Sequence, residues 1–161
     1  MAYACVRTDN MSGTTVSKDL VSLKYFDGEN EAPIENGSVV LIGEYLEGQR
    51  EVRKATDVAS NSKLSEVALI AHEEVDKTKS HNTLKEYINE ADMNVRGYRL
   101  TSKDCFSVTK EAFVTQGVLA KGSIVELTDG TKLKAVSTAS GATTVGKIVA
   151  VEGEWYVVEV E

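Results

Sequence analysis

The chain has 161 residues with 18 Lys or Arg against 25 Asp or Glu, which gives a formal net charge of −7. This acidic balance disfavours a nucleic-acid backbone or an anionic membrane as the main partner, because binding either requires clustered Lys and Arg. The length predicts one domain, or two small subdomains that share a core. Folding at this size buries about two thirds of the unfolded chain's surface, so no covalent or metal staple is needed.

The sequence shows no feature of export or membrane insertion. Cys5 and Cys105 are far apart and suggest neither a metal site nor a disulfide framework, which favours a reducing compartment. No basic region leads into an apolar one after Met1, so we expect no secretory signal. No apolar run approaches the roughly 20 residues that span a bilayer. We therefore expect a protein made in a cytoplasm, with no membrane partner.

Residues 1–20 form the first expected segment, an N-terminal arm. Its polar composition predicts little burial of apolar surface. Two interpretations fit this composition: an arm that becomes ordered on a partner, or an ordinary frayed terminus.

Residues 21–117 are predicted to be β-rich, because strand-like runs alternate with turns made of Gly, Asn, Asp and Ser. One short helix is expected within this region, near residues 83–91, where Thr83 and Glu86 have the spacing of a capping box. A helix of about nine residues is marginal alone, so we expect it to pack across a sheet edge or barrel mouth. The expected strands are 16–26, 34–46, 50–55, 66–72, 95–100 and 105–108, followed by a helical turn at 109–113.

Residues 118–161 are predicted to form two consecutive β-hairpins that join 21–117 in one compact domain. Asp129-Gly130 lies between two runs of β-forming residues, a strong signal for a type I′ turn with positive φ at both central residues. Glu152-Gly153 has the same role between the last two strands. The expected fold class is therefore mainly β (α+β), with antiparallel hairpins forming a small barrel or sandwich and one short inserted helix.

Two segments of the chain resemble each other. Residues 34–40 and 119–125 each contain an apolar residue, two variable residues, Gly-Ser and then two β-branched residues. A glycine that begins a strand explains each copy by itself. A true duplication would instead place two related β-units side by side.

No motif in the sequence indicates catalysis or cofactor binding. His72 and His81 lie among acidic residues without the spacing of a metal site, and are interpreted as surface residues of a charged loop. Cys105 with His72 as its base matches no family signature. The spacing of Gly117 and Gly122 is not that of a phosphate-binding loop. We therefore expect no enzyme, no catalytic residue, no cofactor and no metal.

A small basic group is the nearest approach to a charged binding site. It consists of Arg50, Arg53 and Lys54. These side chains could contact phosphates, but cations on an exposed strand more often protect a sheet edge from unwanted pairing. The protective role is our interpretation.

The closing part of the chain resembles small structural proteins of tailed-bacteriophage heads. The similarity lies in a Gly-Ser-Ile-Val-Glu-Leu-Thr-Asp-Gly strand and turn, a polar loop, and Val-Gly-Lys-Ile-Val-Ala-Val-Glu-Gly-Glu-Trp-Tyr-Val-Val-Glu-Val. The Gly97–Leu100 strand and the Asp104–Phe113 segment are similar too, so the resemblance covers about 95–161. It implies a non-enzymatic virion structural protein that binds the assembled capsid and decorates or stabilises it.

The resemblance also implies a partner and a location. The partner is the major capsid protein of a phage head, and the location is the capsid surface, with the host cytoplasm before assembly. Self-association on the capsid lattice is compatible with this role. Tyr3 and Val6 are isolated apolar residues in the polar arm and are predicted anchors, whose docking offsets the entropy lost on ordering. Arg7 is the third candidate partner-binding residue.

Three alternatives stay open. A small OB- or SH3-like barrel that binds nucleic acid or a protein would share the hairpins, and would show exposed aromatics interleaved with Lys and Arg. A hydrolase or isomerase on a β-barrel would show buried ionisable groups in a pocket. Another virion part, such as a head fibre, adaptor or tail protein, is the interpretation nearest to capsid decoration.

Overall fold

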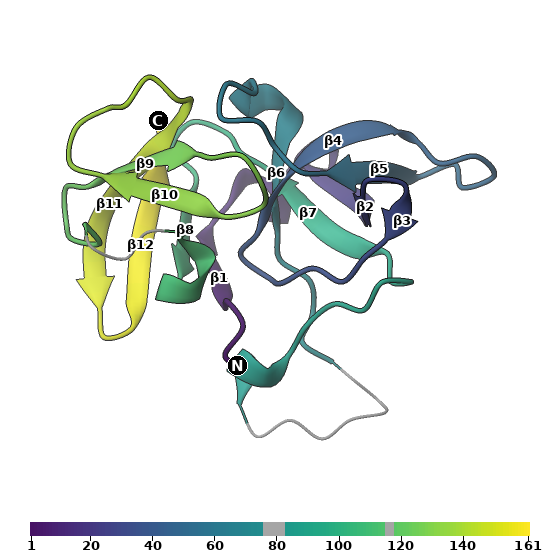
Figure 1. Ribbon diagram of the computed structural model, residues 1–161, viewed down its shortest axis with the longest axis horizontal. Helices are drawn as coiled ribbons and strands as arrows, with labels where there is room; N and C mark the ends of the chain where they lie inside the picture. The colour runs from purple at the N-terminus through teal and green to yellow at the C-terminus, as the bar shows by residue number, and fades with distance from the viewer. Residues whose placement is uncertain (76–82, 115–117) are drawn as a thin grey trace.

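The computed structural model describes residues 1–75, 83–114 and 118–161, which fold into two six-stranded sheets (Figure 1). The first sheet has the order β3-β2-β5-β4-β6-β7, and an additional β2–β7 pairing closes five of its strands into a barrel. We call this the first barrel. The strands of this sheet are β2 (Leu20–Asp27), β3 (Asn30–Glu31), β4 (Val39–Tyr45), β5 (Val52–Thr56), β6 (Val67–Ile70) and β7 (Val95–Arg99).

The second sheet has the order β1-β8-β12-β11-β9-β10. The mainly β class is thus confirmed, and a closed barrel with a second sheet replaces the open choice between barrel and sandwich. The strands of the second sheet are β1 (Val6–Asn10), β8 (Cys105–Val108), β9 (Ile124–Leu127), β10 (Leu133–Val136), β11 (Thr144–Glu152) and β12 (Trp155–Val160).

Both predicted C-terminal hairpins are present, since β9 pairs with β10 and β11 with β12, each antiparallel. The first turn is not of type I′, however, because Gly130 has a φ of 122° while Asp129 has no positive φ. Gly130 exchanges two backbone hydrogen bonds of 3.0 Å with Val58, which follows β5 of the first sheet. A contact distant in sequence therefore determines the shape of this turn.

The two sheets contain the same five-stranded unit. In the first barrel, β4 pairs with β5 and β6, β6 with β7, and β7 with β2, all antiparallel. In the second sheet, β9 pairs with β10 and β11, β11 with β12, and β12 with β8, again antiparallel. A parallel β2–β5 pairing closes the first barrel. The second unit has a parallel bridge in the corresponding place, between Phe113, which follows β8, and Leu133 of β10. The order and direction of the strands are the same in both units.

The similar segments 34–40 and 119–125 occupy equivalent places in these units. Each contains a glycine with positive φ and a buried serine, followed by the first strand of a hairpin. In each, the glycine N–H donates to an isoleucine carbonyl, and the N–H of that isoleucine donates to the serine carbonyl. The bonds run from Gly37 to Ile70 (2.8 Å), Ile70 to Ser38 (2.8 Å), Gly122 to Ile148 (2.7 Å) and Ile148 to Ser123 (2.9 Å). The sequence similarity therefore marks a repeated structural unit.

One hydrophobic core joins the two units. Phe106 of β8 is fully buried in a cluster that also contains Val39 and Leu69 of the first barrel. Their neighbours Val40 and Ile70 belong to a separate cluster inside that barrel. Because β4 and β6 are buried on both faces, they are continuous apolar runs in the sequence rather than alternating ones.

Residues 1–20 belong to this structure and are not a free arm. β1 pairs with β8, and both Val6 and Met11 are buried in the shared core. Asp104 accepts hydrogen bonds from the N–H groups of Ser12 (2.8 Å) and Thr101 (2.9 Å), which fixes the chain after β1. Polar composition was a poor guide here, because a strand with one buried face needs apolar residues only at alternate positions.

The helix expected near 83–91 is a single 3-10 turn, η4 (Leu84–Glu86). Leu84 is 52% exposed, and Thr83 makes no side-chain capping bond. Asn89 exchanges backbone hydrogen bonds of 2.9 and 3.1 Å with Ile34, which holds the chain extended where the helix would continue. The turn expected at 109–113 is present. The remaining 3-10 turns are η1 (Ser12–Thr14), η2 (Ser17–Asp19), η3 (Leu64–Glu66) and η5 (Lys110–Ala112). None of the helical segments in the described residues is long and apolar enough to cross a membrane.

A substitution in β11 tests the close approach of β11 and β12. A Cβ at Gly146 would lie 1.9 Å from the Glu159 carbonyl oxygen, so Gly146→Ala must displace backbone and should lower the free energy of unfolding by about 3 kcal/mol. Gly48→Ala is the control, because its Cβ meets open space and only its φ of +73° is unfavourable, at about 1 kcal/mol. Urea denaturation measures both, and equal losses would contradict the close approach.

Candidate functional site

The three candidate partner-binding residues lie on or just before β1, which runs between the two units (Figure 1). Tyr3 is half-buried, and its N–H donates to the Lys85 carbonyl (2.8 Å). Val6 is 8% exposed and packs in the shared core, so its apolar surface is already used within the chain. Arg7 is the most exposed of the three, with 43% of its side chain accessible.

Arg7 forms a surface site with the β11–β12 hairpin. Its guanidinium carbon lies 4.3 Å from the centroid of the Trp155 ring, and one of its nitrogens lies 3.8 Å from a Glu152 carboxylate oxygen. The register explains this arrangement, since Arg7 pairs with Ser107 of β8 and Ser107 pairs with Val157 of β12, so that the three share one face. We call Arg7, Glu152, Trp155 and Val157 the Arg7–Trp155 surface.

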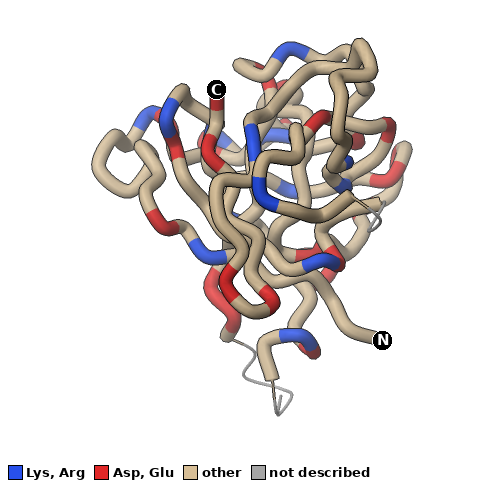
Figure 2. Tube along the Cα trace, turned by 90° about the vertical axis from the view of Figure 1, so that its left-hand side faces the viewer, with Lys and Arg blue, Asp and Glu red and all other residues tan. Residues whose placement is uncertain are grey.

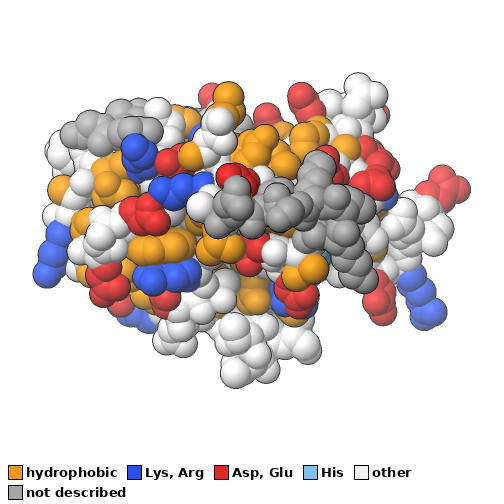
Figure 3. Space-filling view, turned by 90° about the horizontal axis from the view of Figure 1, so that it is seen from below, with side chains coloured by type: hydrophobic (Ala, Val, Ile, Leu, Met, Phe, Trp, Pro, Cys, Tyr) orange, Lys and Arg blue, Asp and Glu red, His pale blue; other side chains and the backbone are white. Residues whose placement is uncertain are grey.

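Apolar side chains continue near the tip of this hairpin. Val149 is 38% exposed and Val151 is 43% exposed. Figure 3 views the molecule from the side of the N-terminus and shows small hydrophobic patches between charged side chains. Trp and Arg are the residue types that most often dominate protein-protein binding energy. The strand pattern predicts Trp155 in a strand but gives no signal for a site, although it is the chain's single Trp, followed closely by valines.

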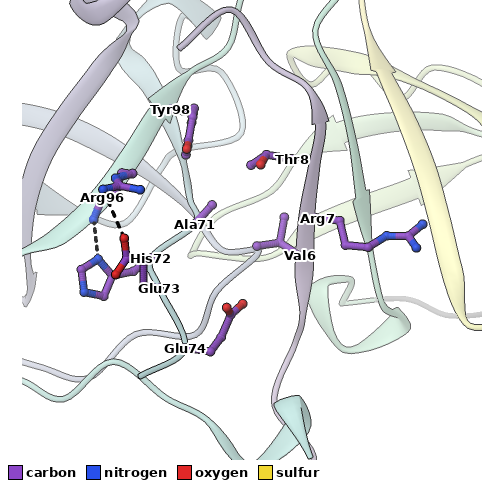
Figure 4. A pocket seen from close by; sticks show the side chains of 9 residues that line it. All are labelled: Val6, Arg7, Thr8, Ala71, His72, Glu73, Glu74, Arg96 and Tyr98. Carbon is purple, nitrogen blue, oxygen red and sulfur yellow. Dashed lines mark hydrogen bonds and ion pairs between the residues drawn. The ribbon is translucent and has the colours of Figure 1, made fainter. Parts of the chain in front are cut away.

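A polar cavity of about 230 Å³ lies on the opposite side of β1. Figure 4 shows Val6 and Thr8 directed toward it and Arg7 directed away, as the alternation of a strand requires. Arg96 contributes an ion pair to Glu73 (3.7 Å). Two of the charged groups that border the cavity are therefore paired with each other.

His72 lines this cavity and is half-buried rather than a free surface residue. Its ring Nδ1 accepts a hydrogen bond from the Arg96 backbone N–H (3.3 Å), and the His72 backbone N–H donates to Asn36 Oδ1 (3.0 Å). Burial, together with the Arg96 charge, lowers the pKa of His72 below its usual value of 6.5. His81 lies outside the described residues. Within 1–75, 83–114 and 118–161, no group of three or more His, Cys, Asp or Glu is arranged to hold a metal ion.

The two cysteines are poor nucleophiles in this fold. Burial raises the pKa of Cys5 to about 11. Burial also raises the pKa of Cys105, and the carboxylates of Asp9 and Glu159 act in the same direction. Because the thiolate is the reactive form, both thiols are weakly reactive near neutral pH. Cys105 lies in β8 and His72 follows β6, in different units of the fold.

Glu126 is a fully buried carboxylate with a structural explanation. It accepts hydrogen bonds from the Ser140 backbone N–H (2.8 Å) and from the Ser140 hydroxyl (2.5 Å). These bonds fasten the loop between β10 and β11 to β9. The group is therefore satisfied within the chain and does not indicate an active site.

The pH dependence of stability should report the environment of His72. Since its pKa is lowered in the native state, the unfolded chain binds a proton more readily below about pH 6.5. Neutral His72 therefore contributes to the free energy of unfolding above that pH, and this contribution is lost as the pH falls below it. We expect His72→Gln to remove this part of the decline in the free energy of unfolding between about pH 7 and pH 5. Urea denaturation across this range measures it, and parallel curves for both proteins would contradict the assignment.

Known proteins do not guide the interpretation of these sites. No family model, no curated protein and no solved structure matches the chain. A functional assignment therefore depends on the sequence and on the geometry of the described residues.

Proposed function

We propose that this protein is a non-enzymatic structural protein of a phage virion, which binds the assembled capsid and decorates or stabilises it. The resemblance of residues 95–161 to phage-head proteins suggests the partner, and the Arg7–Trp155 surface is the observation that supports binding to a protein. It combines a tryptophan, an arginine held over its ring at 4.3 Å, and the half-buried Val157 on an ordered hairpin. This composition is typical of the centre of a protein-binding interface.

The rigidity of the surface supports the same role. Trp155 begins β12, which pairs with both β11 and β8, while Arg7 is held in β1 by pairing with β8. Side chains that are already fixed lose little conformational entropy on binding, which favours affinity. In this proposal the partner is the major capsid protein and the site of action is the capsid surface.

The candidate partner-binding residues Val6 and Arg7 have different roles in the proposal. Arg7 remains a contact residue, whereas Val6 holds β1 in the core and positions Arg7. Removing residues 1–15 would delete β1 and expose the shared core, so truncation would confuse loss of folding with loss of binding. Single surface substitutions avoid this problem.

The first test is the composition of purified particles. Virions from the source culture, separated by sedimentation and density banding, should contain the protein at a fixed ratio to the major capsid protein, as measured by quantitative mass spectrometry. Purified protein added to particles that lack it should co-sediment and saturate at the same ratio. Absence from the particles would contradict the proposal.

The second test assigns the interface to the Arg7–Trp155 surface. Trp155→Ala should weaken particle binding by at least about tenfold, because truncating a central aromatic typically costs about 2 kcal/mol. Phe26→Ala is the matched control: Phe26 is also a half-buried aromatic with a cation over its ring, Lys54 Nζ at 4.9 Å, but it lies in the first barrel. Equal binding by the two variants, each shown to be folded by circular dichroism, would move the interface elsewhere.

A further inference from the structure

A second cavity, of about 440 Å³, opens at one end of the first barrel. We call it the barrel mouth and define it by the charged and aromatic residues that line it. These are Lys18, Tyr45, Arg50, Glu51, Arg53 and Arg99. Four cations and one carboxylate therefore surround this opening, in a chain whose net charge is −7.

Strand alternation directs two of these arginines toward the end of the barrel interior. Ala55 belongs to the core inside the barrel, and Arg53 lies two residues earlier on the same face of β5. A Cβ at Gly97 would lie 2.5 Å from Leu23 inside the barrel, and Arg99 follows two residues later on the same face of β7. The apolar interior of the barrel therefore ends at two guanidinium groups.

Neutral groups orient the two arginines, and no carboxylate among the described residues neutralises them. Arg53 Nε donates to the Gly43 carbonyl (2.8 Å), and its guanidinium carbon lies 5.1 Å from the Tyr45 ring centroid. Arg99 donates to the Ser65 carbonyl (3.4 Å).

None of the four cations of the barrel mouth forms an ion pair with another described residue. Elsewhere acidic and basic residues are interspersed along the chain (Figure 2), and the cations Arg7, Lys24 and Arg96 are paired with carboxylates.

We propose that the barrel mouth binds a short acidic segment, rich in Asp or Glu, of a partner protein. Guanidinium groups bind carboxylates with two parallel hydrogen bonds, and the acceptors now holding Arg53 and Arg99 are neutral, so both charges remain available. Leu20 and Val21 supply apolar surface within the cavity for the carbon chains of the segment. Tyr45, 64% exposed, borders the opening.

A peptide fits this site better than a nucleic acid does. Glu51 in the mouth opposes either ligand, but a short acidic segment can place its carboxylates on the four cations alone, whereas a phosphate backbone carries a charge on every nucleotide. Beyond the mouth it would cross the surface of an acidic protein, where repulsion opposes it. Sequence-independent binding of single strands also uses several stacking aromatics, whereas the mouth contains only Tyr45. The site lies on the first barrel and does not depend on the Arg7–Trp155 surface.

Fluorescence anisotropy with three labelled probes tests the proposal at about 50 mM and about 200 mM salt. The probes are a twelve-residue peptide of alternating Glu and Gly, the corresponding Lys peptide, and a twelve-nucleotide oligothymidylate. We expect the full-length protein to bind the Glu peptide, with affinity that falls as salt rises, and to bind neither of the other probes as tightly. Tighter binding of the oligothymidylate would overturn the proposal in favour of nucleic acid.

Two double variants of equal charge locate the binding. Lys18→Gln/Arg50→Gln removes two exposed cations of the mouth and should weaken binding of the Glu peptide by about tenfold. Lys63→Gln/Lys121→Gln removes two exposed cations outside the mouth and should leave the affinity within about twofold. No binding of the Glu peptide, or an equal loss in both variants, would overturn the proposal. Particle binding of the Trp155→Ala variant is measured separately, so the two proposals can fail independently.

Discussion

A hydrophobic core shared by two β-units is the constraint on which this structure depends. Its strands are short, β6 having four residues and β8 four, and a unit of this size by itself buries only a modest fraction of its surface. β4 and β6 increase the buried area because both of their faces are buried, one inside the first barrel and one against the second sheet. Phe106 lies in the shared cluster, so the stability of each unit depends on the other.

The same constraint fixes the surface beside β1. Since Val6 is held in the shared core, alternation directs Arg7 to the other face, where it meets Trp155. The site is thus a consequence of core packing and not of a flexible arm. This matters for the proposed capsid role, because a surface fixed before binding loses less entropy on docking than a segment that must first become ordered.

The repeated unit explains how one topology carries two different surfaces. Both copies keep the glycine turn and its return hydrogen bonds, at Gly37 and Gly122. Elsewhere the copies differ. The fourth residue after the glycine is Leu41 in the first copy and Glu126 in the second, and the Glu126 carboxylate binds the loop between β10 and β11. In the first barrel the interior ends in arginines that form no ion pair with any described residue, whereas the second unit carries the Arg7–Trp155 surface. The two copies therefore share a backbone topology but carry different side chains at their surfaces.

The sequence by itself determined the β class, most of the strands and both closing hairpins, because two-residue periodicity and glycine turns act locally. It also suggested a repeat, as one of two interpretations of its Gly-Ser pairs. Only the tertiary structure decided that residues 83–91 form no helix, that residues 1–20 pack as part of the fold, and which residues meet at the barrel mouth. Local helix propensity amounts to tenths of a kcal/mol per residue, and the Asn89–Ile34 bridge, across 55 positions, overrides it. Lys18, Arg53 and Arg99 are likewise distant in sequence, and barrel closure alone brings them together.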